Sequence, residues 1–117
     1  MPERPELPDF HLTVARTGDR AVVAVAGEMD LVTAGDFAEA VRDQLAGGPV
    51  VLDFAALSFM DSSGVRVLDT LLREAEREGW TLVVRPQLHA NVRQILDMTG
   101  MIGVLPLEDE RPSEESR

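Results

Sequence analysis

The chain has 117 residues, enough for one domain with a single core, and its 44% hydrophobic and 27% charged residues are ordinary for a soluble globular protein. It has no cysteine, which excludes disulfides, thiolate nucleophiles and cysteine-ligated metal sites. All 11 basic residues are arginine, which excludes Schiff-base chemistry, and the formal charge of −10 argues against nucleic acid as a partner.

The ends and the hydropathy of the chain bear on its compartment. No segment approaches the ~18 consecutive apolar residues that a transmembrane helix needs. The first residues, Met1 to Glu6, lack the basic-then-apolar order of a signal peptide. We therefore expect a cytoplasmic protein that binds no membrane. Its arginine-only cations, beside many Ala, Gly and Pro residues, hint at a GC-rich bacterial genome.

The first part of the chain predicts a lead-in and a strand hairpin. Residues 1–9 contain three prolines and mixed charges, which favour a flexible lead-in. Apolar and less apolar residues alternate over 10–15, the period of a half-buried strand. A second strand is predicted over 20–26, and the Thr-Gly-Asp turn at 17–19 joins the two.

A first helix is predicted after the Gly-Glu-Met-Asp segment at 27–30. Thr33 and Asp36 have the Thr-x-x-acid form of a capping box, which satisfies backbone N–H groups of a first helical turn. Apolar residues then recur at helical spacing, at Ala34, Phe37, Ala38, Val41 and Leu45. The Gly-Gly-Pro segment at 47–49 ends this helix.

A buried strand and a second helix follow. Residues 50–54 form a nearly continuous apolar run, as expected of a strand covered on both faces. After the polar cluster Asp61-Ser62-Ser63-Gly64, one helical stripe is apolar, at Val65, Leu68, Leu71, Leu72 and Ala75. On the polar side Asp69 and Arg73 are spaced as an i,i+4 pair, and Gly79 is placed to end the helix.

The last part predicts a strand over 80–84, a helix from about 90 to 98 and a final short strand over 101–105. From Glu108 onward the sequence is acidic and polar, so residues 108–117 are predicted to be a disordered tail. We therefore assign the folded domain to residues 10–107.

The order of the predicted elements (strand, strand, helix, strand, helix, strand, helix, strand) is that of a single α/β domain. Helices connect the central strands, so those strands are expected to run parallel, whereas the first two form an antiparallel hairpin. We predict a mixed β-sheet with parallel central strands packed against amphipathic helices.

Three interpretations compete for Ser62, the residue on which function depends. In the first, Asp61, Ser62 or Ser63 is an ordinary cap of the second helix. A hydrolase nucleophile would need a general base, but the only histidines are His11 and His89, and there is no Gly-x-Ser-x-Gly elbow. A phosphoacceptor at a helix start would lie beside free N–H groups that tolerate a phosphate. Residue chemistry disfavours the nucleophile and leaves the other two interpretations open.

Three segments resemble the STAS domains of the anti-sigma factor antagonist family, in order and at compatible spacing. They are Gly27-Glu28-Met29-Asp30, the run VLDFAALSFMDSSG over 51–64, and Leu96-Asp97-Met98-Thr99-Gly100. The middle motif is the most specific, and the resemblance spans residues 10–107. It implies a STAS-type fold and a binding protein rather than an enzyme, and we expect no cofactor and no metal site.

In that family the serine directly after the motif aspartate is phosphorylated, and Ser62 holds that position. The resemblance implies that the kinase is the partner itself, an anti-sigma factor with serine kinase activity. Unphosphorylated protein would bind the anti-sigma factor and thereby release a sigma factor. Phosphorylation at Ser62 would end this binding, and a PP2C-type phosphatase would restore it.

The same resemblance assigns roles to the residues around Ser62. Asp61 would orient the serine hydroxyl toward the kinase site of the partner, while Ser63 and Gly64 would shape the helix start where the partner docks. Asp30 maps to the loop that flanks the phosphoacceptor and is expected to touch the partner. The alternative for Asp30 is a turn aspartate near the first helix.

The chain departs from the family pattern in two places. Where the family often has Leu-Gly after the motif glycine, this chain has Val65-Arg66. Arg66 puts a long cation one turn from Ser62, where it could tune partner choice or hold the phosphate. His89 stands where the family often has Ser-Pro and is expected to be a solvated cap. Three further residues are expected to pack in the core or in turns: Met29, Phe59 and Met60.

Two alternatives to the leading function stay open. The first is a STAS partner-switching module that regulates a different signalling protein, and an unbiased pull-down would separate it from an anti-sigma factor antagonist. The second is small-molecule or nucleotide sensing, which requires a ligand pocket that the sequence does not display.

Overall fold

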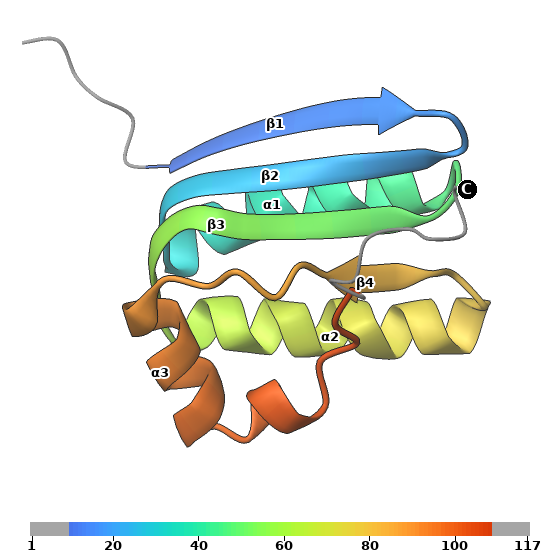
Figure 1. The fold of residues 1–117 in the computed structure, drawn as a ribbon. Coiled ribbons are helices and arrows are strands. Elements are labelled where there is room, and N and C mark those ends of the chain that lie inside the picture. The colour runs from blue at the N-terminus through green and yellow to red at the C-terminus, as the bar shows by residue number, and fades with distance from the viewer. Residues whose placement is uncertain (1–9, 109–117) are drawn as a thin grey trace, which may run out of the picture.

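A four-stranded mixed sheet forms the middle layer of the domain in the computed structural model, which describes residues 10–108. The strands lie in the order β1-β2-β3-β4 (Figure 1). They are β1 (Phe10–Thr17), β2 (Arg20–Met29), β3 (Val50–Met60) and β4 (Leu82–Val84). β1 and β2 form an antiparallel hairpin, and β2, β3 and β4 pair in parallel. The predicted α/β fold with parallel central strands is confirmed.

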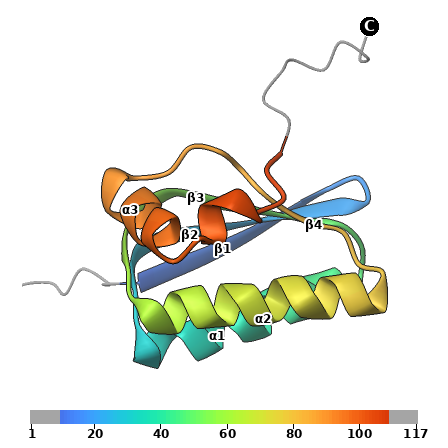
Figure 2. The same cartoon turned by 90° about the horizontal axis from the view of Figure 1, so that it is seen from below.

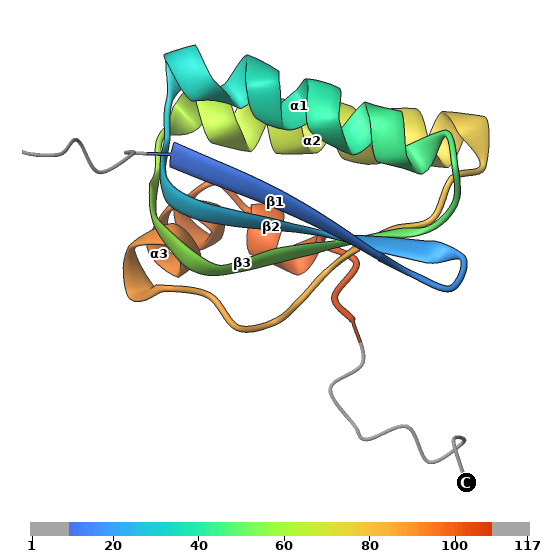
Figure 3. The ribbon, with the colours of Figure 1, turned by 90° about the horizontal axis from the view of Figure 1, so that it is seen from above.

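Helices cover both faces of this sheet. They are α1 (Leu31–Leu45), α2 (Ser62–Glu78), α3 (Ala90–Met98) and the short 3₁₀ helix η1 (Met101–Gly103). Figures 2 and 3 show α1 and α2 side by side on one face, with α3 and η1 on the other. None of the helices within residues 10–108 has the length and the apolar character that crossing a membrane requires.

Most of the core lies between the sheet and the pair α1 and α2, and buried residues of α3 and η1 extend it on the other face. All five apolar residues that the helical period assigned to the inner face of α1 are buried. On β2 alternate residues are buried, at Ala21, Val23 and Val25, as a strand period of two requires. Phe37 of α1 meets Phe54 of β3 with ring centroids 5.9 Å apart. The same face of the sheet thus anchors both helices whose first residues form the site described below.

The start of α1 differs from the prediction. The capping box predicted at Thr33 and Asp36 is wrong, because the helix begins earlier, at Leu31, with Asp30 as its cap. Thr33 belongs to the real capping box as its third helical residue. Its hydroxyl accepts from the backbone N–H of Asp30 (2.9 Å), while the Asp30 carboxylate accepts from the backbone N–H of Thr33 (3.1 Å).

Other predicted boundaries also move: β2 runs on to Met29 instead of ending at residue 26, and β4 begins at Leu82 instead of residue 80. β3 continues to Met60 instead of ending near residue 54, because its later residues keep pairing with β2 as far as Met29. The strand predicted over 101–105 is wrong, since those residues form η1 and turn Met101 into the core. Leu107 makes only an isolated parallel bridge with Val84 of β4. The predicted lead-in lies outside the described residues.

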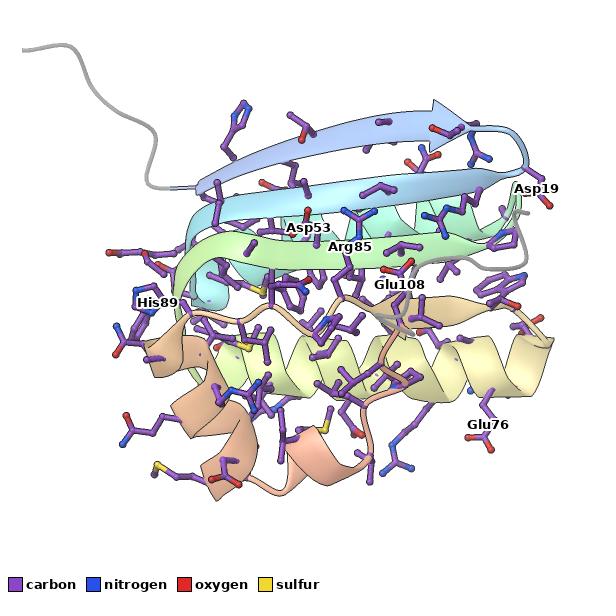
Figure 4. All side chains as sticks on the ribbon, in the orientation of Figure 1. Asp19, Asp53, Glu76, Arg85, His89 and Glu108 are labelled. Carbon is purple, nitrogen blue, oxygen red and sulfur yellow. The ribbon has the colours of Figure 1, made fainter. Side chains whose placement is uncertain are left out.

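A cluster of charged residues ties the end of the described chain to the sheet. Figure 4 shows Asp53, Arg85 and Glu108 lying together on one face of the sheet. The Arg85 guanidinium lies 3.2 Å from the carboxylates of both Asp53 and Glu108, and Arg20 lies 3.3 Å from Glu108. The backbone N–H of Glu108 also donates to the carbonyl of Val84 (2.8 Å). Glu108 is therefore held against β4, and the rest of the predicted tail lies outside the described residues.

An ion pair between α1 and α2 gives a pH-dependent prediction. The Arg42 guanidinium donates two hydrogen bonds to the Glu74 carboxylate (2.8 and 2.9 Å), which lowers the pKa of Glu74 below its ordinary value of 4.5. A lowered folded-state pKa stabilises the fold above the unfolded pKa, and this contribution is lost as pH falls through the folded pKa. Glu74→Gln is expected to lower the free energy of unfolding by about 0.5–1 kcal/mol at pH 7.

Urea unfolding at pH 7 and pH 3 measures this effect. The difference between wild type and Glu74→Gln should shrink at pH 3, because the stabilisation is lost progressively as pH falls below the unfolded-state pKa of Glu74 toward its lower folded-state pKa. Glu76→Gln is the matched control, since Glu76 is an exposed residue of the same helix (Figure 4). A difference that is the same at both pH values would contradict the ion-pair explanation.

Candidate functional site

β2 and β3 end side by side, and each is followed at once by an aspartate that begins a helix. Met29 pairs with Met60 in the parallel register, and the backbone N–H of Asp61 donates to the carbonyl of Met29 (3.1 Å). Asp30 and Asp61 are therefore neighbours at the same edge of the sheet. Figure 2 shows α1 and α2 starting from this end, with α3 close to it on the other face.

Asp61 is the cap of α2. Its carboxylate accepts from the backbone N–H groups of Ser63 (2.8 Å) and Gly64 (3.3 Å), and its own backbone carbonyl accepts from Val65 (3.2 Å). Of the interpretations offered for the polar cluster, the helix cap is observed, with the aspartate and not a serine in that role. The hydroxyl of Ser62 is consequently not needed to hold the helix start.

Ser62 is the first residue of α2, and its side chain is exposed. No group within residues 10–108 makes a hydrogen bond with its hydroxyl. The serine lies between two hollows of the surface. The first, of about 450 Å³, is lined by Phe59, Met60, Asp61, Ser62, Asn91, Gln94, Ile95 and Met98. The second, of about 400 Å³, is lined by Ser62, Val65, Arg66, Asp69, Thr99 and Met101.

Neither of the two histidines lines either hollow. His89 caps α3, where its Nδ1 accepts from the backbone N–H of Asn91 (3.0 Å; His89 is labelled in Figure 4). The expectation of a cap role for His89 is confirmed. His11 lies on β1 and lines a separate hollow on the sheet. Neither histidine therefore lines a surface with Ser62 as the general base of a hydrolase would.

Gly64 is buried, which gives it a different role from the other residues predicted to meet a partner. A Cβ atom placed on Gly64 would lie 2.5 Å from Cγ of Met60 and 3.1 Å from Sδ of Met29. Both methionines are fully buried, as expected for packing residues. The missing side chain thus lets the start of α2 approach the ends of β2 and β3. Gly64 is therefore packed within the start of α2, near Ser62, and is itself buried.

Asp30 is the cap of α1 and is only partly buried. Its Oδ1 accepts from the backbone N–H groups of Val32 (3.0 Å) and Thr33 (3.1 Å) and from the Thr33 hydroxyl (3.2 Å). The hydrogen bond from the Thr33 backbone holds the pKa of the Asp30 carboxyl below its ordinary value. Asp30 is therefore ionised at neutral pH and adds negative charge beside the start of α2.

The remaining predicted residues flank Ser62 on α2. Ser63 is half-buried and its backbone N–H donates to the Asp61 carboxylate, whereas Arg66 is exposed and lines the second hollow. The structure thus brings Ser62, Asp61 and Arg66 onto one surface.

Several apolar residues at this end of the molecule are exposed, which the sequence pattern did not predict. Leu31 and Val32 at the start of α1 are 77% and 81% exposed, Met98 at the end of α3 is 76% exposed, and Phe59 is 44% exposed. The expectation that Phe59 is a packing residue is wrong. Met60 is buried, and because successive strand residues face opposite ways, Phe59 points outward. We call Phe59, Met98, Leu31 and Val32 the apolar rim.

Comparisons with known proteins bear on this site. A profile of the STAS domain family matches residues 11–113. The anti-sigma-F factor antagonist RsfB of Mycobacterium tuberculosis is 37% identical over 59 residues, which are 49% of this chain and 48% of RsfB. The match therefore spans about half the length of that relative.

Solved structures are similar over nearly the whole chain. The crystal structure of an anti-sigma factor antagonist from Mycobacterium paratuberculosis is 26% identical with a TM-score of 0.74, covering 96% of this chain and 94% of that one. The unphosphorylated anti-sigma factor antagonist SpoIIAA is 22% identical with a TM-score of 0.70, covering 91% and 92%. The phosphorylated form of SpoIIAA from Bacillus is 22% identical with a TM-score of 0.64, covering 91% and 96%. At this identity the likeness to SpoIIAA is one of fold.

Proposed function

We propose that this chain, which belongs to the STAS domain family, is an anti-sigma factor antagonist controlled by phosphorylation of Ser62. The names of two relatives support the first part, RsfB over half of the chain and the Mycobacterium paratuberculosis protein over nearly all of it. The proposed role is binding and release of a partner rather than catalysis.

The observation that carries the proposal is the state of the Ser62 hydroxyl. It is exposed, and Asp61 performs the capping that would otherwise occupy a serine at a helix start. A kinase can therefore reach this hydroxyl without unfolding α2. The positive end of the helix dipole and the N–H groups of the first turn favour a phosphate at this position. Phosphorylated protein would thus keep its fold.

We place the partner on the surface around Ser62. The first hollow and the apolar rim expose Phe59 and Met98 beside the serine, and exposed apolar residues gathered in this way are typical of a docking site. The proposed occupant is an anti-sigma factor with serine kinase activity, whose active site would reach Ser62 as it docks. In the unphosphorylated state this docking would keep the anti-sigma factor from its sigma factor.

Phosphorylation would then break the complex by electrostatics. A phosphate adds about −1.5 to −2 charges at neutral pH. It would lie near the carboxylates of Asp30 and Asp61, in an interface from which a docked partner excludes water. Desolvation and like-charge repulsion at an interface cost several kcal/mol, enough to release a partner. A PP2C-type phosphatase would restore binding by removing the phosphate.

Mapping of the phosphate tests the site. Wild type incubated with the cognate anti-sigma factor kinase and ATP is expected to gain one phosphate, and Ser62→Ala none. Thr70→Ala is the matched control, because Thr70 is an exposed hydroxyl residue of the same helix that lines neither hollow, and its loss should leave phosphorylation unchanged. Intact-protein and peptide mass spectrometry measure both outcomes. A phosphate found on another residue, or retained by Ser62→Ala, would refute the assignment.

A further inference from the structure

Arg66 differs from most arginines of the described chain because its guanidinium has no partner there. Within residues 10–108, five arginines form ion pairs, and these are Arg20, Arg42, Arg73, Arg77 and Arg85. Arg16 donates a hydrogen bond to the side chain of Gln44 (2.8 Å). Arg66 forms neither kind of contact with any residue in this range, although it is exposed on a helix rich in carboxylates.

The position of Arg66 relative to Ser62 is specific. The two residues are four apart on α2, so their side chains leave the same face of the helix, and both line the second hollow. The anion site precedes the cation in the chain, which is the favourable order for an i,i+4 pair. Asp69 also lines this hollow, but its carboxylate accepts from Arg73 (3.0 Å). The other residues that line it, Val65, Thr99 and Met101, carry no charge.

We propose that the guanidinium of Arg66 binds the phosphate of phosphorylated Ser62 across the second hollow. This inference rests on the proposed phosphorylation of Ser62 and identifies the residue that would bind the phosphate. A guanidinium has a planar fork of donors that matches two phosphate oxygens, and the flexible stem of an exposed arginine gives it the reach.

Two consequences follow for the switch. Arg66 would share the negative charge of the phosphate with the helix dipole, so modification would stabilise the start of α2 rather than loosen it. The same contact would withdraw a cation from the docking surface. In the unmodified protein Arg66, which has no side-chain partner within residues 10–108, would be available to an acidic group of the partner; in the modified protein the phosphate would occupy it. Phosphorylation would therefore change the docking surface by more than the phosphate charge alone.

A titration of the phosphate tests this contact without the kinase. Phosphoserine is installed at position 62 during translation, and the second pKa of the phosphate, ordinarily near 6, is followed by ³¹P NMR. In Arg66→Gln this pKa is expected to rise by about 0.3 unit or more relative to the wild-type background, because an i,i+4 ion pair is lost. Arg66→Lys, which keeps the charge but not the fork, should fall between the two.

Control variants separate a direct contact between Arg66 and the phosphate from a general effect of protein charge on the phosphate pKa. Arg93→Gln removes an exposed cation of α3 that lines neither hollow, and it should leave the phosphate pKa unchanged. The Nε–H signal of Arg66 should also shift as the phosphate titrates. Equal phosphate pKa values in Arg66→Gln and wild type would overturn the inference and leave the proposed function standing. Failure of the kinase to modify Ser62 would overturn the proposed function while the titration still reports on Arg66.

Discussion

Ser62→Asp is expected to lower the affinity for the anti-sigma factor by at least ~100-fold while the protein folds as the wild type does. The aspartate carries a negative charge at the first position of α2, where the helix dipole favours an anion, so the fold has no reason to change. A partner docked over the apolar rim would have to bury that charge beside Asp30 and Asp61. Calorimetry or surface plasmon resonance measures the affinity, and circular dichroism measures the fold.

A charge placed elsewhere is the control for this variant. Thr81→Asp adds the same charge to an exposed side chain just beyond the far end of α2, and it should bind the partner as the wild type does. If Ser62→Asp and wild type bind with equal affinity, the electrostatic switch is wrong even if Ser62 is phosphorylated. A loss shared by Thr81→Asp would point to net charge rather than to the site.

Gly64→Ala is expected to destabilise the fold, because the added methyl group collides with Met60 and Met29 beneath the start of α2. Overpacking of this kind costs about 1–3 kcal/mol. The gain in helix propensity from Gly to Ala, up to about 1 kcal/mol, opposes it. Urea unfolding measures the sum, and partner binding should weaken too, because α2 can relieve the collision only by moving Ser62.

The variant Gly35→Ala separates the cost of the steric collision from the gain in helix propensity. Gly35 is also inside a helix, but a Cβ atom there would meet nothing within 4 Å. Gly35→Ala should therefore be neutral or stabilising by up to about 1 kcal/mol, and the difference between the two variants is the cost of the contact alone. Two alanine variants of equal stability would show that the methionines make room, and the packing role of Gly64 would be wrong.

Local pattern predicted most of the elements and misplaced some of their ends. The inner face of α1, the end of α2 at Gly79 and the span of α3 follow from side-chain period and turn chemistry, and the structure confirms them. The errors fall where two local solutions compete. Asp30 and Thr33 are both good cap residues, and only the end of β2 at Met29 makes Asp30 the cap. Residues 101–105 are apolar enough for a strand, but a turn at Gly100 directs Met101 inward instead.

The order of the elements and the chemistry of the candidate site follow from neighbouring residues in the sequence. An aspartate followed by a serine at a strand-to-helix junction is a matter of adjacent residues, and so is the spacing of Ser62 and Arg66 on one helix face. The surroundings of that serine, in contrast, depend on how distant segments pack together. The rim combines α1, β3 and α3, whose residues lie tens of positions apart, and the parallel pairing of Met29 with Met60 brings the first two together. Which apolar side chains stay exposed depends on how the layers pack, and no local pattern specifies that.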